Sequence, residues 1–154
     1  MKIRIGDEVL TEPIRVRIRL DYRGEAQSAR FFFGSRSQVE MAEEVREQQV
    51  ALLRNVPLQG IFIENIDLST DIYLVTETER RKLQKIAYAP VILTLRLENV
   101  DDLIPLLLKP EFRKIEFLSP ENVTTHRLDM ERLLFRVSQA YQQELKALQS
   151  TYQS

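Results

Sequence analysis

The chain has 154 residues, enough for one domain with a sizeable core. A formal net charge of −1 provides no global attraction for nucleic acid or an anionic membrane, and the lack of cysteine excludes disulfides, thiol catalysis and Cys-ligated metals. Apolar runs are only a few residues long and the N-terminus lacks the apolar region of a secretory signal, so we expect a cytoplasmic protein without a membrane span.

The N-terminal part predicts strands. Residues 14–22 read IRVRIRLDY, in which apolar residues alternate with arginines. This period of two is typical of a strand with one buried and one polar face. Turn-forming residues around Gly24 and the apolar run at 29–34 then predict an N-terminal β-hairpin, with its first strand toward a sheet edge. Residues 2–5 suggest a further short strand.

A helix is predicted to begin after Ser37. The spacing Ser37-x-x-Glu40 fits a capping box, in which both side chains satisfy free backbone N–H groups. An apolar stripe follows to about Arg54, and Pro57 and Gly60 end the helix.

The middle of the chain predicts two buried strands and a short helix. Residues 60–66 (GIFIENI) and 71–75 (DIYLV) are compact apolar runs, which favour central strands buried on both faces. Residues 76–87 (TETERRKLQKIA) are rich in charge, and Thr76-x-x-Glu79 fits a second helix cap. We therefore expect a short helix there.

The next segment predicts a strand, a helix and a strand. Residues 90–98 alternate, with the apolar side chains facing inward. Asn99 is a suitable N-cap for a helix that is kinked at Pro105 or begins again there. A strand at 114–118 completes a βαβ unit, so we expect a locally parallel pair.

The chain ends in a long predicted helix, from about residue 123 or 125 to near 150. Apolar residues recur every three or four positions along one face, namely at Leu134, Val137, Tyr141, Leu145, Leu148 and Tyr152. A helix of this length spans ~39 Å, more than the diameter of a small domain. Its end should overhang the core or fray, and Val137, Tyr141, Leu145 and Leu148 are candidate oligomer contacts.

Together these elements predict one α+β or α/β domain over residues 1–154. It should contain a mixed sheet of five to seven strands with an N-terminal hairpin, about four helices, and the long amphipathic helix at the C-terminus. No motif is specific enough to indicate a family.

The arginine stripe is the first candidate site. Arg15, Arg17, Arg19 and Arg30 form a possible contact for an anion or an acidic partner. A half-buried strand also needs a polar face, and carboxylates of neighbouring strands can pair with these arginines. The aromatic residues cluster at the strand ends rather than among the cations, unlike the stacking platforms of single-strand binders, so nucleic acid is the weaker interpretation.

Catalytic and metal motifs are missing from the sequence. His126 is the only histidine, and its neighbour Asp129 alone does not make a metal site or a catalytic pair. No phosphate-binding glycine loop, GxSxG elbow or HExxH pattern occurs. Adjacent carboxylates such as Asp101 and Asp102 point about 100° apart on a helix and do not converge on one atom. We therefore expect no catalytic, cofactor-binding or metal-binding residues.

These observations favour a non-enzymatic protein that acts through protein–protein contacts, as a homodimer, an adaptor or a regulatory subunit. One alternative is association with nucleic acid through the arginine strand. The second is an enzyme whose site is assembled from residues scattered in the sequence, which a single chain does not exclude.

Overall fold

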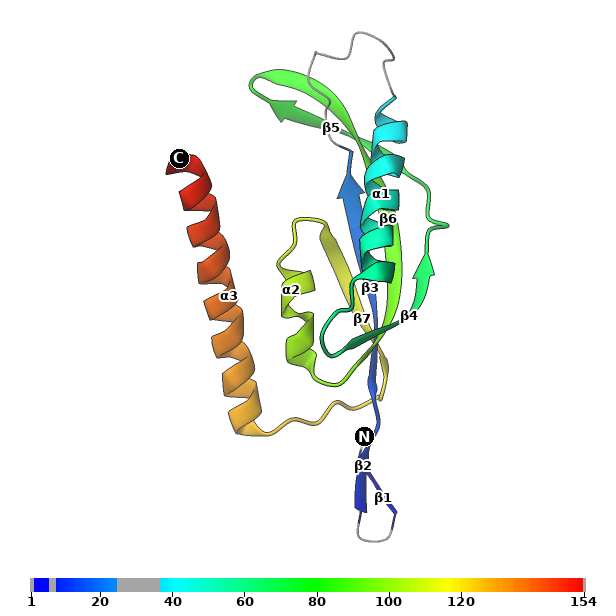
Figure 1. Cartoon of the computed structure of the whole chain (residues 1–154), viewed down its shortest axis with the longest axis vertical. Helices are drawn as coiled ribbons and strands as arrows, with labels where there is room; N and C mark the ends of the chain where they lie inside the picture. The colour runs from blue at the N-terminus through cyan, green and yellow to red at the C-terminus, as the bar shows by residue number, and fades with distance from the viewer. Residues whose placement is uncertain (1, 6–7, 25–36, 154) are drawn as a thin grey trace.

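The computed structural model describes residues 2–5, 8–24 and 37–153, and its centre is a five-stranded antiparallel sheet (Figure 1). The strand order is β4–β6–β3–β7, with β5 paired to β6 as well, and β1 and β2 form a separate two-stranded sheet. The strands are β1 (Lys2–Ile5), β2 (Glu8–Thr11), β3 (Ile14–Arg23), β4 (Ile61–Asp67), β5 (Tyr73–Glu79), β6 (Lys82–Leu97) and β7 (Phe112–Ser119). The helices are α1 (Gln38–Asn55), α2 (Ile104–Leu107), which follows the 3₁₀ turn η1 (Val100–Leu103), and α3 (Arg127–Gln153).

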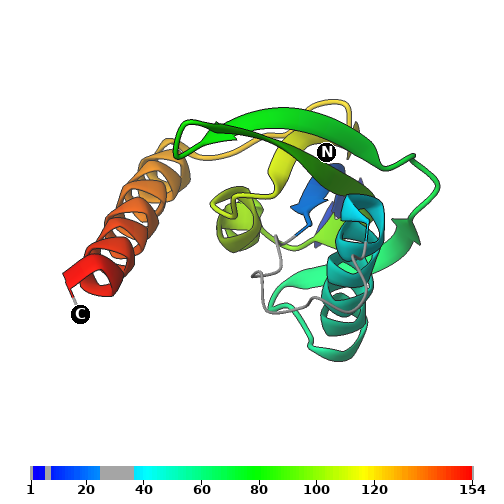
Figure 2. The ribbon, with the colours of Figure 1, turned by 90° about the horizontal axis from the view of Figure 1, so that it is seen from above.

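The core lies on one face of the sheet. Alternate residues of β3 and β6 point to this face and are almost fully buried: Val16, Ile18, Leu20, Val91, Leu93, Leu95 and Leu97. Val50 of α1, Leu103 of η1 and Leu106 of α2 complete the cluster. Figure 2 shows α1 and α2 on the same side of the sheet, so no helix of the described residues lies over the other face, which carries the arginines of β3. The alternation in IRVRIRLDY therefore marks this division correctly.

Helix α1 follows the local signals of the sequence. Ser37 is its N-cap, and the Ser37 hydroxyl accepts a hydrogen bond from the backbone N–H of Glu40. Fully buried Ala42 packs against Ala87 and Ala89 of β6, because only small side chains allow the helix to approach the strand this closely.

The expectation that residues 14–22 lie toward an edge is wrong. β3 pairs with β6 along its whole length and with β7 on its other side, so it is central. The expected hairpin partner, residues 29–34, lies outside the described residues. The hairpin that the structure does contain at the N-terminus joins β1 to β2, and of these strands only residues 2–5 were predicted.

The helix predicted at residues 76–87 is also wrong. β5 continues to Glu79, β6 begins at Lys82, and the two strands form a hairpin. The two residues between them, Arg80 and Arg81, have φ angles of 51° and 66°, the positive values of a type I′ turn. The side chains at 82–85 are exposed, so this part of the hairpin has no buried face to impose alternation, and the charged sequence resembled a helix.

The sheet is antiparallel rather than mixed, and the predicted parallel pair is absent. β6 and β7 do run in the same direction, and η1 and α2 form the crossover between them. However, β3 lies between the two strands and pairs antiparallel with each. The sequence identified the crossover but not the strand inserted into it.

Two further expectations need correction. β4 and β5 are strands, but they pair one after the other with the same edge of β6, at residues 92–97 and 82–88, rather than lying in the centre of the sheet, and much of each strand is exposed. The described residues contain three α-helices rather than about four. The expected break near Pro105 is confirmed, since η1 changes there into α2, with proline in its first turn.

The long C-terminal helix is confirmed. Within the described residues, α3 has 27 residues and contacts α2, and it stands beyond α2 at the side of the molecule where the sheet ends in β7 (Figures 1 and 2). No helix in the described part of the chain is long and apolar enough to cross a membrane.

Candidate interaction surfaces

The arginines of β3 are paired with carboxylates of the same chain. Arg15 donates through Nε and Nη2 to Glu64 of β4, at 3.0 and 2.9 Å. This hydrogen bond lowers the pKa of the Glu64 carboxyl. The hydrogen bond and the negative charge of Glu64 together raise the pKa of Arg15. The cationic stripe seen in the sequence is thus largely neutralised by carboxylates that are distant in sequence and come near β3 only in the folded structure.

The remaining pairs continue along the same open face. Arg17 lies 3.4 Å from Glu116 of β7, and Arg23 lies 3.1 Å from Glu77 of β5. The carboxylates Glu64, Glu77 and Glu116 were not identified from the sequence. The sequence indicated only that the arginines need carboxylate partners, not which residues these are. Arg30, the fourth predicted contact, lies outside the described residues.

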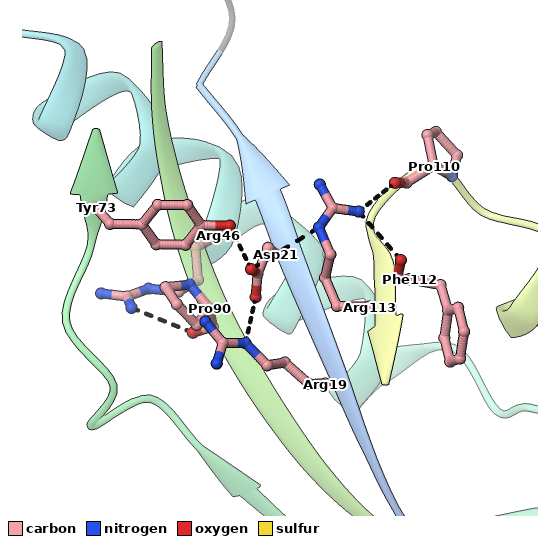
Figure 3. A network of polar contacts seen from close by, with 8 residues as sticks. All are labelled: Arg19, Asp21, Arg46, Tyr73, Pro90, Pro110, Phe112 and Arg113. Atoms are coloured by element: carbon pink, nitrogen blue, oxygen red, sulfur yellow. Dashed lines mark hydrogen bonds and ion pairs between the residues drawn. The ribbon is translucent and has the colours of Figure 1, made fainter. Parts of the chain in front are cut away.

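A buried carboxylate, Asp21, organises the upper part of this face (Figure 3). Asp21 is only 3% exposed and accepts hydrogen bonds from Arg19 Nε, at 2.8 Å, and from the Tyr73 hydroxyl. Arg113 Nε lies 3.9 Å from its second oxygen, and the Arg113 guanidinium also donates to the carbonyls of Pro110 and Phe112. One carboxylate therefore connects β3, β5 and β7, which are not all neighbours in the sheet.

Tyr88 of β6 links this group to a second one. Its ring stacks on Tyr73 with centroids 5.5 Å apart, its hydroxyl donates to Glu77, and the Arg113 guanidinium lies 5.6 Å from its centroid. Burial is the main reason that the pKa values of both tyrosines are raised. Both phenols are protonated donors with carboxylate partners, and both oxygens of Asp21 accept a protein donor. The network thus joins four strands of the sheet, β3, β5, β6 and β7.

The residues considered for metal binding or catalysis do not converge. His126 is exposed before α3, where its carbonyl accepts the first helical hydrogen bond from Met130. Asp101 of η1 forms a 2.7 Å ion pair with Arg136 of α3 instead of meeting another acid. Among the described residues, no three His, Cys, Asp or Glu side chains lie close enough to hold a metal ion.

The predicted oligomer contacts lie together on α3. We call Leu134, Val137, Tyr141, Leu145 and Leu148 the α3 stripe. Leu134, Tyr141 and Leu148 are 62%, 53% and 54% exposed, and Leu145 is partly covered. Arg136, Leu133 and Ala140 lie on a different side of the helix, and Arg136 is the residue that reaches η1. The α3 stripe is therefore displaced from the side that contacts the rest of the chain.

Comparisons with known proteins add no relative: no family model, no curated protein and no solved structure matches this chain.

Proposed function

We propose that this is a non-enzymatic cytoplasmic protein that acts through protein–protein contacts, with α3 as the contact element of a homodimer. The observation that carries the proposal is the exposed α3 stripe. A helix that belongs to one chain alone normally turns its apolar side toward its own core. Here the apolar side runs from Leu134 to Leu148 without a covering element among the described residues.

A second copy of α3 is the partner that the sequence of the helix favours. Its middle, residues 137–143 (VSQAYQQ), has no charged side chain. Two such helices can therefore meet at their centres without opposing like charges, which a two-fold contact would otherwise repeat. Spacings of three, four, four and three residues keep the stripe on one side of the helix, so two helices can stay in contact along it.

The energy of such a helix pair is close to the limit for a stable dimer. Leu134, Tyr141 and Leu148 are more than half exposed, and Val137 and Leu145 less. These five side chains from each copy contribute roughly 1 kcal/mol apiece on burial, or ~10 kcal/mol in total. Association costs an estimated ~4–15 kcal/mol in lost freedom. The stripe can drive dimerisation, and a second contact in the same interface would make it secure.

The intrachain pairs of Arg15, Arg17 and Arg19 favour this proposal over nucleic-acid association. Phosphate binding requires cations that are free to neutralise it, whereas each of these arginines already bonds a carboxylate of its own chain.

The test uses two double variants of α3 with equal added charge. Val137→Glu with Tyr141→Glu introduces charge into the stripe, and Gln139→Glu with Gln143→Glu introduces it on exposed positions away from the stripe. We expect light scattering at high micromolar concentration to give the mass of two chains for the wild type and the control, and of one chain for the stripe variant. A monomeric wild type, or a stripe variant that remains dimeric, contradicts the proposal.

A further inference from the structure

The outer edge of β7 is a second candidate contact surface, in addition to the α3 stripe. The sheet ends at β7, which pairs with β3 on one side and with no described strand on the other. Irregularities in the β3–β7 register occur between Arg15 and Val16 and between Arg19 and Leu20. They leave residues 114–117 of β7 as a regular segment. An outer strand of this kind presents backbone N–H and C=O groups to another strand.

We propose that β7 pairs antiparallel with the β7 of a second copy, about a two-fold axis at Ile115, so that the two sheets join. This inference deepens the proposed function and rests on it, because it assigns the second contact of the same homodimer. The occupant of the edge is thus another copy of this chain rather than an unrelated peptide.

The register follows from the faces and charges of β7. Residues opposite each other in an antiparallel pair share a face, so the two-fold axis must pass through a residue and not between two residues. An axis at Lys114 opposes two lysines, and an axis at Glu116 opposes two glutamates; both arrangements are destabilising. An axis at Ile115 places each Lys114 opposite the Glu116 of the other copy.

Lys114 and Glu116 are available for this exchange. Both side chains lie on the open face of the sheet, where Lys114 Nζ is 2.7 Å from Glu116 Oε1 of the same chain. Their side chains are 66% and 40% exposed. Lys114 and Glu116 can keep this contact and also face Glu116 and Lys114 of the second copy across the β7–β7 contact.

On the helix-covered face of β7, an apolar side chain at the edge of the sheet is left exposed, and the second copy would cover it. Phe117 lies opposite the fully buried Val16 yet is 48% exposed, and it borders an open hollow of about 560 Å³ with Leu118, Pro120 and Val123. The joined sheets would continue past this side chain instead of ending at it.

The position of α3 fits the same axis. In Figure 1, α3 runs antiparallel to β7, and Figures 1 and 2 both place it beyond α2 on the side where the sheet ends. A two-fold axis through β7, perpendicular to the sheet, brings the α3 of the second copy to the same side of the sheet in the opposite direction. The strand seam and the helix pair can then share one two-fold axis.

The lack of cysteine permits a clean cross-linking test. In the Ile115→Cys variant, the two introduced thiols face each other across the axis with Cα atoms ~4.5–5.5 Å apart, within disulfide range. The matched control is Phe117→Cys, on the same strand and face, whose two copies would be separated by ~14 Å. Mild oxidation should link the first variant and not the second. Exposure alone predicts the opposite order, because Ile115 is more buried than Phe117.

A second experiment tests the β7 pairing by exchanging the charges of Lys114 and Glu116. Lys114→Glu alone and Glu116→Lys alone each oppose like charges, and we expect the dimer dissociation constant to rise roughly 3–30-fold in sedimentation experiments. The double variant restores opposite charges and should return toward the wild-type value.

The outcomes separate the two proposals. If the stripe variant of α3 dissociates the dimer while Lys114→Glu leaves it unchanged and Ile115→Cys does not cross-link, the β7 seam is overturned and the helix dimer stands. Equal cross-linking of Phe117→Cys and Ile115→Cys overturns the register. A monomeric wild type overturns both proposals.

Discussion

Asp21 offers the sharpest test of how the open face of the sheet is held together. The change Asp21→Ala removes the acceptor of the hydrogen bonds from Arg19 and Tyr73 and leaves Arg113 without its nearby carboxylate. A hydrogen bond to a charged group contributes about 1.5–3 kcal/mol, and a buried donor left unpaired adds to the loss. The Arg19 and Arg113 side chains are 37% and 36% exposed, so water compensates part of the effect.

We therefore expect a loss of ~2–3 kcal/mol in the free energy of unfolding, taking the low end of these values. For a chain of this size, 1 kcal/mol corresponds to about 2–4 °C, so Tm should fall by about 4–12 °C. Asp21→Asn should be intermediate, because the amide oxygen can still accept from Tyr73 while the charge is lost.

The assay is thermal and urea unfolding followed by circular dichroism at one protein concentration, since dimerisation makes Tm concentration-dependent. The matched control is Glu64→Ala, which breaks the exposed pair with Arg15 and should lower Tm clearly less. The reasoning is refuted if Asp21→Ala melts within about 1 °C of the wild type, or if both variants lose the same stability.

Two further predictions concern the backbone and the pH dependence. Gly60 has φ of +74°, and a Cβ there would lie 2.1 Å from Asp102 Oδ2. Gly60→Ala should cost at least about 1–2 kcal/mol in urea unfolding, part of which Asp102→Ala should recover; an unchanged midpoint would contradict the turn geometry. Burial is the main cause of the raised pKa of Tyr22, as it is for Tyr73 and Tyr88. Because the pKa of Tyr22 is higher in the folded state than the unfolded value near 10, the protonated phenol contributes to the free energy of unfolding. This contribution is complete below pH 10 and is lost as the pH rises above it. Urea midpoints between neutral pH and pH ~11 should fall, less steeply for Tyr22→Phe; parallel curves would show that Tyr22 does not contribute.

The contrast between the two ends of β6 shows where sequence patterns are informative. At residues 91–97, alternate side chains face the core, so burial imposes a period of two and the strand was predicted correctly. At residues 82–85 both faces are exposed, the pattern disappears, and a helix was predicted in error. Periodicity reports burial on one side, and it fails where a strand extends beyond the core.

The candidate surfaces divide in the same way. The α3 stripe could be predicted from the sequence because its spacing is a property of one continuous helix. The Asp21 network was not, because Asp21, Tyr73, Tyr88 and Arg113 come from four strands that are brought together only by the antiparallel order of the sheet.

The sequence by itself determined the buried and polar sides of β3, the start of α1 at Ser37, and the length and apolar side of α3. Each of these depends on interactions between residues a few positions apart. Only the tertiary structure decided that β3 is central, which carboxylates neutralise its arginines, and that no described element covers the outer edge of β7 or the α3 stripe. Strand order is the reason: alternation states which way a side chain points, but the neighbour it meets comes from a distant part of the chain.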